Sequence, residues 1–300
     1  MTARLFLSLV FTMLLWAGTF ISARLLAGEA TPSVSAFLRF AIASLSLAGI
    51  ILISGKRLSL PPKKAWFSLI ILGATGVFAY NVCFFNGLRY INAGRASLFM
   101  ASTPLVIIFV TILSGMERAS LRKIIGVLTS LIGAVLIITN GHPLTFLASG
   151  SFGMGEISLL GCVASWSAFT LAGRLALRHL SPLHTICWAS IVGSAMLFPL
   201  ACRDGLLTSL PALPWQVWAN VAYLGVFGTA VGFSLYYQGI ETAGASRAGI
   251  FINLVPVFSV LLSWLLLGEA VHLVVLLGGI LVLSGVSLAS FSSQQAKPLN

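Results

Sequence analysis

The chain has 300 residues, of which 58% are hydrophobic and 8% are charged, and its formal net charge is +11. Soluble domains carry roughly 25% charged residues, so a soluble globule of this length would lack the polar surface that it needs, and a lipid bilayer is the solvent that fits. A strongly basic soluble protein would suggest a nucleic-acid partner, but basic loops orient membrane proteins, and we therefore expect none here.

The second feature is a series of long apolar runs. About 20 residues in a helix cross the roughly 30 Å of a bilayer's hydrocarbon core, and ten runs reach this length. They are Leu5–Leu26, Val34–Ile53, Trp66–Leu88, Ala93–Ser114, Leu121–Thr139, Gly155–Leu177, Leu183–Cys202, Trp215–Gly239, Ala245–Leu267 and Val271–Ser290. The sequence therefore predicts an all-α integral membrane protein with ten transmembrane helices.

The basic residues predict the orientation of these helices, because cytoplasmic loops carry an excess of lysine and arginine. With the N-terminus inside, 12 basic residues fall on the cytoplasmic side and 5 on the other, which together are the 17 of the chain. The loops at 56–64 and 118–123 contribute seven of the 12. Both termini are thus expected in the cytoplasm.

The two halves of the chain resemble each other when they are shifted by 152 residues. This shift pairs Leu72 with Leu224, Gly73 with Gly225, Gly76 with Gly228, Gly87 with Gly239, Arg95 with Arg247, Phe99 with Phe251, Pro104 with Pro256 and Glu117 with Glu269. A shift of 150 residues pairs Trp16 with Trp166 and Arg24 with Arg174. We predict two five-helix repeats, at residues 5–139 and 155–290. Because five is odd, the second repeat is inverted, as in many secondary transporters.

These positions also resemble a known family. Each half has a Trp in its first helix, an Ala-Gly-Arg-Ala or Ala-Ser-Arg-Ala turn before its fourth (93–96 and 245–248), a mid-helix Pro and a Glu after the fourth. This pattern is similar to the drug/metabolite transporter superfamily, in particular to EamA-type ten-helix exporters and, among them, bacterial aromatic amino-acid exporters. The resemblance implies an alternating-access efflux carrier of the inner membrane. Its central cavity would be lined by helices one to four and six to nine, with helices five and ten at the periphery.

Polar, small and aromatic residues at helical spacing mark the faces that could line such a cavity. The candidate substrate-binding residues are Trp16, Thr19, Phe20, Tyr80, Ser97, Trp166, Phe169, Tyr236 and Asn253. Trp16 and Trp166 fit core packing and a cavity wall equally well. The glycines of the eighth segment, Gly228 and Gly232, fit close helix packing as well as a pore. Asn253 is singled out because an unpaired amide in hydrocarbon is costly.

Charged residues and prolines supply the remaining candidates. Arg39 is the charge deepest in a span, where either snorkelling to the interface or contact with an anion would explain it. No acidic residue falls at mid-membrane, and the chain has no G-x-x-x-x-G-K-[ST] loop for ATP phosphates. Pro104 and Pro256 lie at the centres of their segments and could be hinges or static kinks. The cysteines and histidines lack metal-ligand spacing, so we expect no metal and no cofactor.

The leading hypothesis is a monomeric secondary transporter that exports amino acids, aromatic and other largely neutral ones, and that has a small-molecule substrate and the lipid bilayer as its partners. Export of other small metabolites or drugs is an alternative. A nucleotide-sugar or phosphate-ester exchanger would need several basic residues in the spans, where only Arg39 comes near. A membrane enzyme would need paired carboxylates or a nucleophile with its base, which the spans lack. A channel or scaffold is disfavoured by the inverted repeat.

The orientation is tested by cysteine labelling in a background without the four native cysteines. A cysteine placed between Lys56 and Lys64 should react with a membrane-impermeant reagent only from the cytoplasm, because the basic loops lie there. A cysteine placed at His142 should react only from the opposite side. The reverse pattern would contradict the charge argument.

Overall fold

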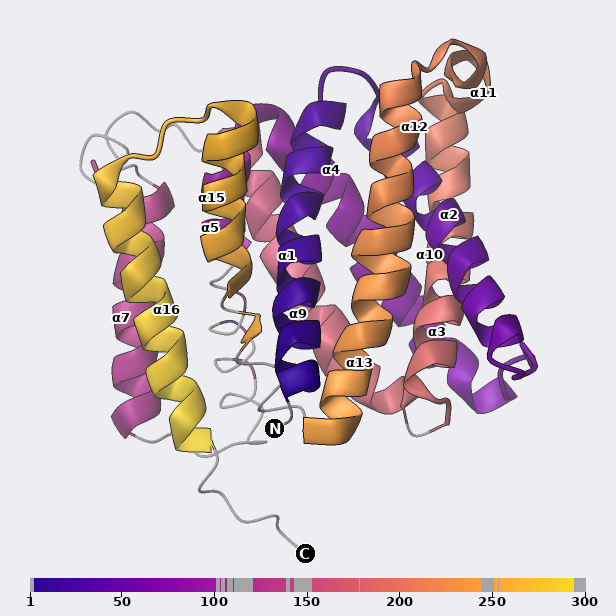
Figure 1. Ribbon diagram of the computed structural model, residues 1–300, viewed down its shortest axis with the longest axis horizontal. Coiled ribbons are helices and arrows are strands. Elements are labelled where there is room, and N and C mark those ends of the chain that lie inside the picture. Colours follow the sequence, from indigo (N-terminus) through magenta and orange to yellow (C-terminus); the bar gives the residue numbers. More distant parts are fainter. Residues whose placement is uncertain are drawn as a thin grey trace, which may run out of the picture.

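The computed structural model describes residues 3–100, 103, 106, 110, 121–138, 141–142, 153–177, 179–243, 251–252 and 254–293. Within these ranges the regular structure is entirely helical (Figure 1). The predicted all-α class is thus confirmed for the described part of the chain. Five of its helical runs are long and apolar enough to cross a bilayer, and Leu254–Leu267 and Leu273–Gly285 are shorter apolar helices. The five are Ala3–Leu26, Pro32–Ile53, Lys63–Tyr90, Pro182–Arg203 and Trp215–Tyr236.

The helix bounds agree closely with the apolar runs wherever the structure describes a whole run; of Ala93–Ser114 and Ala245–Leu267 it describes helix only at Ala93–Met100 and Leu254–Leu267. The first half contains α1 (Ala3–Leu26), α2 (Pro32–Ile53), η1 (Lys63–Ala65), α3 (Trp66–Leu72), η2 (Gly73–Ala79), α4 (Tyr80–Tyr90), α5 (Ala93–Met100) and α7 (Leu121–Ile138). The second half contains α9 (Met154–Ala176), α10 (Pro182–Arg203), α11 (Leu206–Ser209), η3 (Leu210–Ala212), α12 (Trp215–Ala222), η4 (Tyr223–Val231), α13 (Gly232–Ala243), α15 (Leu254–Leu267) and α16 (Leu273–Ser293). The short α11 was not predicted.

The second helix of each half begins and ends in the same way. Thr31 is the N-cap of α2 and Ser181 that of α10, and each is followed by a proline at the first helical position. Proline suits this position because its missing N–H would have no partner there. Gly55 and Gly205, just beyond the two helices, have φ of +71° and +92°, a conformation that glycine adopts without strain. All these positions correspond under the 150-residue shift.

Two π-helical segments were not foreseen from the sequence. η2 separates α3 from α4, and η4 separates α12 from α13, so each lies in the middle of a long apolar helix. A π segment leaves carbonyl groups without their usual i+4 donors, and such segments often occur at functional sites. Asn81 Nδ2 donates to the Val77 carbonyl (2.8 Å), and Thr229 Oγ1 donates to the Leu224 carbonyl (2.9 Å). Polar side chains thus donate hydrogen bonds to backbone carbonyls of both π segments.

Glycines of the π segments allow neighbouring helices to approach. A Cβ at Gly73 would lie 2.8 Å from Val192 Cγ1, and one at Gly225 would lie 2.7 Å from Ile42 Cγ2. η2 therefore packs on α10 as η4 packs on α2. A Cβ at Gly228 would also come within 2.6 Å of Thr19 Cγ2. For Gly228, the structure thus shows close helix packing, one of the two alternatives considered for Gly228 and Gly232.

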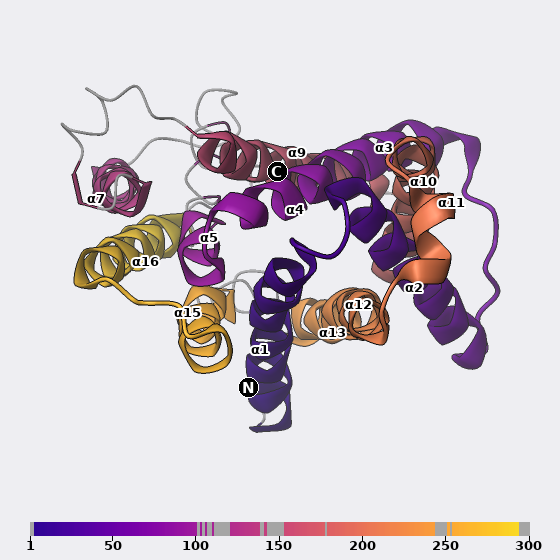
Figure 2. The same ribbon diagram turned by 90° about the horizontal axis from the view of Figure 1, so that it is seen from above.

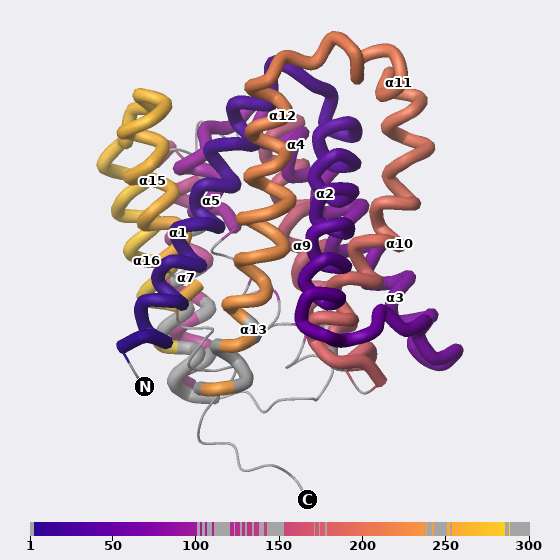
Figure 3. The backbone as a smooth tube through the Cα atoms, turned by 45° about the vertical axis from the view of Figure 1, so that its right-hand side comes forward, coloured from indigo at the N-terminus to yellow at the C-terminus, as the bar shows by residue number. Residues whose placement is uncertain are grey.

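Corresponding helices of the two halves run in opposite directions. In Figure 1 the chain ascends from α3 to α4 and descends from α12 to α13. α2 and α10 lie side by side along their length (Figure 3). They are antiparallel, because Ser33 at the start of α2 donates to Asp204 Oδ2 at the end of α10 (2.6 Å), while Trp188 near the start of α10 donates to the Ser59 carbonyl beyond α2 (3.1 Å). The Ser33 bond, together with Arg203, holds the pKa of Asp204 below its ordinary value.

The helices α7 and α16 form a separate pair at one end of the molecule (Figure 2). They are antiparallel, because Gly133 approaches Gly278 while Gly141 approaches Val274. Ile137, Val275 and Val282 are buried between this pair and Leu98 of α5. Gly133 and Gly278 bring the two backbones together, since a Cβ on Gly133 would lie 2.5 Å from the Gly278 carbonyl oxygen. The main core instead draws most of its buried residues from α1, α2, α4, α5 and α9, with further ones from α10 and α12. This position of α7 and α16 agrees with the peripheral fifth and tenth helices that the family resemblance implied.

The close approach of α7 and α16 predicts that a methyl group added at Gly133 destabilises the protein. Gly133→Ala should lower the free energy of unfolding by about 1–3 kcal/mol, because backbone atoms must move to accommodate the new Cβ. Gly49→Ala in α2 is the matched control, since nothing lies within 4 Å of its added Cβ and alanine favours helix by about 1 kcal/mol. Thermal unfolding of both variants in detergent gives the comparison. Equal stability of the two variants would contradict the packing assigned to Gly133.

Candidate functional site

Most of the candidate residues meet in one cluster of aromatic rings. On one side, Trp16 of α1 contacts Phe233 and Tyr236 of α13, with ring centroids 5.3 and 5.1 Å apart. The Trp16 indole N–H also donates to the Gly228 carbonyl in η4 (3.0 Å). Gly232 leaves room for this ring, since a Cβ there would lie 2.7 Å from Trp16 Nε1. This interaction fixes the orientation of Trp16 against the eighth predicted segment.

The other side of the cluster is built from the corresponding helices of the opposite half. Trp166 of α9 contacts Tyr80 of α4 at 5.1 Å and Phe169 of its own helix at 5.3 Å. Phe169 packs over Gly76 of η2, where an added Cβ would lie 2.1 Å from its ring. The contact between Thr19 and Gly228 is the equivalent in the other half. Each half thus contributes one tryptophan and one tyrosine.

Two residues that the sequence did not single out join these groups. Phe233 contacts both tryptophans, with its centroid 5.3 Å from that of Trp16 and 6.3 Å from that of Trp166. Phe84 stacks on Tyr80 at 5.6 Å and meets Phe20 edge-on at 5.1 Å. We call these eight residues the aromatic cluster: Trp16, Phe20, Tyr80, Phe84, Trp166, Phe169, Phe233 and Tyr236. Phe84 lies four residues after Tyr80, a spacing that could have revealed it.

Burial divides the aromatic cluster into an inner and an outer part. Phe20 and Phe84 are buried, with 5% and 1% of their surface exposed. Trp16, Tyr80, Trp166 and Phe233 are only partly buried, although they contact one another between α1, α4, α9 and α13. Partly exposed aromatic rings offer a surface on which an apolar or aromatic group can pack.

The remaining candidate substrate-binding and hinge residues are not part of the aromatic cluster. Thr19 is buried beside the cluster and its hydroxyl donates to the Trp16 carbonyl (2.6 Å). Ser97 is buried in α5 and donates to the Gly94 carbonyl (2.8 Å), so its role as a cavity residue stays a prediction. Pro256 is buried in the first turn of α15. Asn253 and Pro104 lie outside the described residues.

Arg39 connects the two π-containing helices. It extends from α2, is 7% exposed, and donates from Nη1 to Asn81 Oδ1 (3.0 Å) and from Nε to Thr229 Oγ1 (3.4 Å). These are the same two side chains that satisfy π-segment carbonyls. Its guanidinium also lies 6.0 Å from the centroid of Phe84, at the edge of the aromatic cluster. Arg39 is therefore buried inside the protein, and the snorkelling interpretation is wrong.

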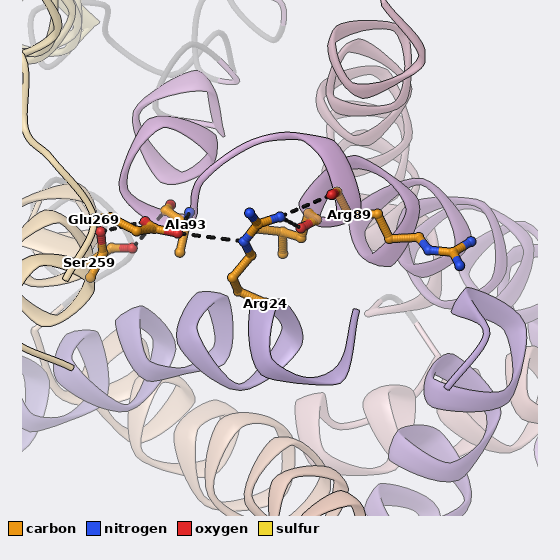
Figure 4. A network of polar contacts seen from close by, with 7 residues as sticks. Arg24, Arg89, Ala93, Ser259 and Glu269 are labelled. Carbon is orange, nitrogen blue, oxygen red and sulfur yellow. Dashed lines mark hydrogen bonds and ion pairs between the residues drawn. The ribbon is translucent and has the colours of Figure 1, made fainter. Parts of the chain in front are cut away.

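A second polar network joins the ends of α1, α4, α5 and α15 (Figure 4). Arg24 at the end of α1 lies 3.6 Å from a carboxylate oxygen of Glu269 and donates to the carbonyls of Leu88 (2.5 Å) and Arg89 (3.0 Å). Glu269 also accepts from the Ala93 backbone N–H at the start of α5 (3.3 Å), where a carboxylate is favourable. The network holds α1, the α4–α5 turn and the end of α15 together.

The comparisons with known proteins identify the family. The profile of the EamA-like transporter family matches residues 4–139 and 153–291, which together are most of the chain. The chain therefore belongs to the EamA-like transporter family. This confirms the resemblance to EamA-type transporters that the sequence motifs indicated. The chain is therefore a multi-pass membrane protein of a transporter family.

Individual relatives of this transporter align along nearly its whole length. YyaM of Bacillus subtilis, named an uncharacterized transporter, is 28% identical over 91% of this chain and 88% of its own. YicL of Salmonella typhimurium, named an uncharacterized inner membrane transporter, is 28% identical over 96% of each chain. A protein of Streptantibioticus cattleyicolor, named a probable terminal-alkyne amino-acid exporter, is 26% identical over 94% of this chain and 91% of its own. A solved structure 19% identical to the chain shares its fold with a TM-score of 0.65, covering 98% of this chain and 100% of that one.

The Arg24 network predicts a local effect on stability. Glu269→Ala should lower the free energy of unfolding by about 1–3 kcal/mol, because Arg24, the Ala93 N–H and the Ser263 hydroxyl, which donates to Glu269 at 2.6 Å, all lose an acceptor. Arg203→Gln is the control, since that arginine is 74% exposed in its ion pair with Asp204 and such pairs contribute little. Thermal unfolding compares the two. A loss no larger than in the control would show that the network contributes nothing to stability.

Proposed function

We propose that this EamA-family transporter exports neutral and aromatic amino acids across the bacterial inner membrane by alternating access. The observation that carries the proposal is the aromatic cluster. Its partly buried rings come from α1, α4, α9 and α13, two helices from each half of the chain. A site of this kind suits an apolar or aromatic side chain, because aromatic rings contribute large contact areas and favourable edge and stacking geometries.

We propose further that the chain forms ten spans arranged as two inverted repeats. Corresponding helices support this, since α2 and α10 are antiparallel, as are α7 and α16, and the π segments occupy equivalent positions. The aromatic cluster lies where the two halves meet, which is where secondary transporters built from inverted repeats hold their substrates. The same symmetry accounts for alternating access, because each half would close one mouth of the site.

The Arg24 network marks the mouth that is closed in this conformation. With both termini in the cytoplasm, as the basic loops favour, the end of α1, the α4–α5 turn and the α15–α16 connection face the periplasm. The structure would then represent a state closed to the periplasm. Pro104 and Pro256, matched by the 152-residue shift, remain our candidate hinges for opening the two mouths. We propose a monomer, because one chain contains both halves of the site.

The amino-acid substrate is supported by the relative named a probable terminal-alkyne amino-acid exporter, together with the uncharged, aromatic character of the cluster. The experiment is counterflow in liposomes containing the purified protein. Vesicles loaded with unlabelled phenylalanine, tryptophan or leucine should accumulate the labelled form of the same amino acid faster than protein-free vesicles. Absence of counterflow for every neutral amino acid in the panel would refute the proposal.

Substitutions in the aromatic cluster should reduce transport. Trp16→Ala, Tyr80→Ala and Trp166→Ala should each lower the rate of phenylalanine counterflow about tenfold or more, because an aromatic contact and its buried area contribute at least 1–2 kcal/mol. Trp264→Ala is the matched control, since Trp264 lies in α15 with 58% of its surface exposed. Protein levels in the membrane must be equal for all four. Wild-type rates in two of the three cluster variants would show that these rings serve packing alone.

A further inference from the structure

The buried cation Arg39 has neutral partners among the residues that the structure describes. The guanidinium has five N–H donors, and the hydrogen bonds to Asn81 and Thr229 use two of them, which leaves three. The ion pairs of the described residues join Arg24 to Glu269, Arg95 to Glu156 and Arg203 to Asp204. None of these carboxylates reaches Arg39. Its positive charge is therefore buried without a negative partner in the described part.

Such an arrangement is costly unless an anion completes it. A buried charge is normally paired, and an unpaired one in a membrane span marks a functional site. The two bonds to Asn81 and Thr229 hold the planar guanidinium in a fixed orientation, and both acceptors are themselves anchored on π-segment carbonyls. Arg39 is thus rigidly positioned before any ligand arrives, which favours binding because little side-chain freedom remains to be lost.

The location of Arg39 indicates which ligand would supply the anion. Its guanidinium lies 5.2 Å from the centroid of Phe40 and 6.0 Å from that of Phe84, and Phe84 stacks on Tyr80 within the aromatic cluster. A ligand that touches both Arg39 and the rings must carry an anionic group beside an apolar one. A free amino acid has this chemistry, and a guanidinium can bind a carboxylate through two parallel hydrogen bonds.

We propose that Arg39 binds the carboxylate of the transported amino acid while the aromatic cluster receives its side chain. This inference rests on the proposed function and refines it, since it makes a free carboxylate a requirement for transport. An amine or an amide with the same aromatic group lacks the anion. With its amino group protonated, such a compound is a net cation, whereas the free amino acid is a zwitterion, so its approach to the buried positive charge of Arg39 is unfavourable.

The test compares competitors that differ only at the carboxylate. Unlabelled phenylalanine and phenylalaninamide compete with labelled phenylalanine in counterflow, and the half-inhibiting concentration of each is measured. In the wild type, phenylalanine should be the stronger competitor by about tenfold or more, the effect of a charge-assisted hydrogen bond. In Arg39→Gln this preference should vanish, because the carboxylate then has no cation to bind. Arg39→Lys retains a cation and should keep part of the preference.

A matched control separates ligand binding from the bridge between helices. Thr229→Val removes one of the two bonds that hold Arg39 but leaves the cation and its bond to Asn81, so the preference for phenylalanine over its amide should be reduced but not abolished. Equal preference in the wild type and Arg39→Gln, or the same loss in Thr229→Val as in Arg39→Gln, would overturn the assignment of Arg39 to the carboxylate. In either case wild-type counterflow of phenylalanine would leave the proposed function standing.

If Arg39→Gln transports too slowly to measure, the binding of labelled phenylalanine to the purified protein is measured instead. The same two competitors are then used to displace the bound label, and the ratio of their affinities replaces the ratio of inhibiting concentrations. Thermal unfolding shows whether Arg39→Gln is folded. If the folded variant still prefers phenylalanine to its amide by about tenfold, the proposal is contradicted. If the wild type neither transports nor binds any amino acid, the proposed function fails, and the role of Arg39 fails with it.

Discussion

The arrangement of this protein depends on the need to satisfy polar groups without water. Inside a bilayer every carbonyl, amide and charge requires a partner within the protein, and in the two π segments the carbonyls of Val77 and Leu224 accept hydrogen bonds from polar side chains. Asn81 and Thr229 donate to those carbonyls, and Arg39 donates to Asn81 and Thr229. One chain of hydrogen bonds thus joins α2 to the middle of both long π-containing helices. The aromatic cluster lies beside this chain, so its rings are carried by helices whose relative positions are fixed.

Symmetry between the halves explains why the cluster contains equivalent residues, and small departures from it explain why the site is polar on one side only. Trp16 and Trp166 correspond, but only Trp16 donates to a carbonyl in the described part, that of Gly228. The carbonyl of the equivalent Gly76 accepts instead from Asn81 (3.3 Å). Arg39 corresponds to Ala189 under the 150-residue shift, so within the described part of the site this buried cation has no counterpart in the second half. A site with one cation is suited to a monoanion and not to the several charges of a phosphate ester.

The sequence predicted the helices well, because apolar runs and short polar connections are direct consequences of the bilayer. It also predicted most of the rings, since Trp16, Tyr80, Trp166 and Tyr236 share helix faces with small and polar residues at helical spacing. It missed the π segments because they follow from glycine packing between helices distant in the chain, as at Gly73 with Val192. The partners of Arg39 were missed for the same reason. Asn81 could have been noticed, since the argument applied to Asn253, that an amide in hydrocarbon needs a partner, applies equally to it.

The central claim is that the aromatic cluster is one binding site shared by the two halves. Equilibrium binding of labelled phenylalanine to the purified protein in detergent tests it most directly, because it requires no transport cycle. The account predicts saturable binding of one molecule per chain, and a loss of affinity when either Trp16 or Trp166 is replaced, since the two halves contribute to the same site. Two molecules per chain, or affinity that depends on one tryptophan and not on the other, would contradict it.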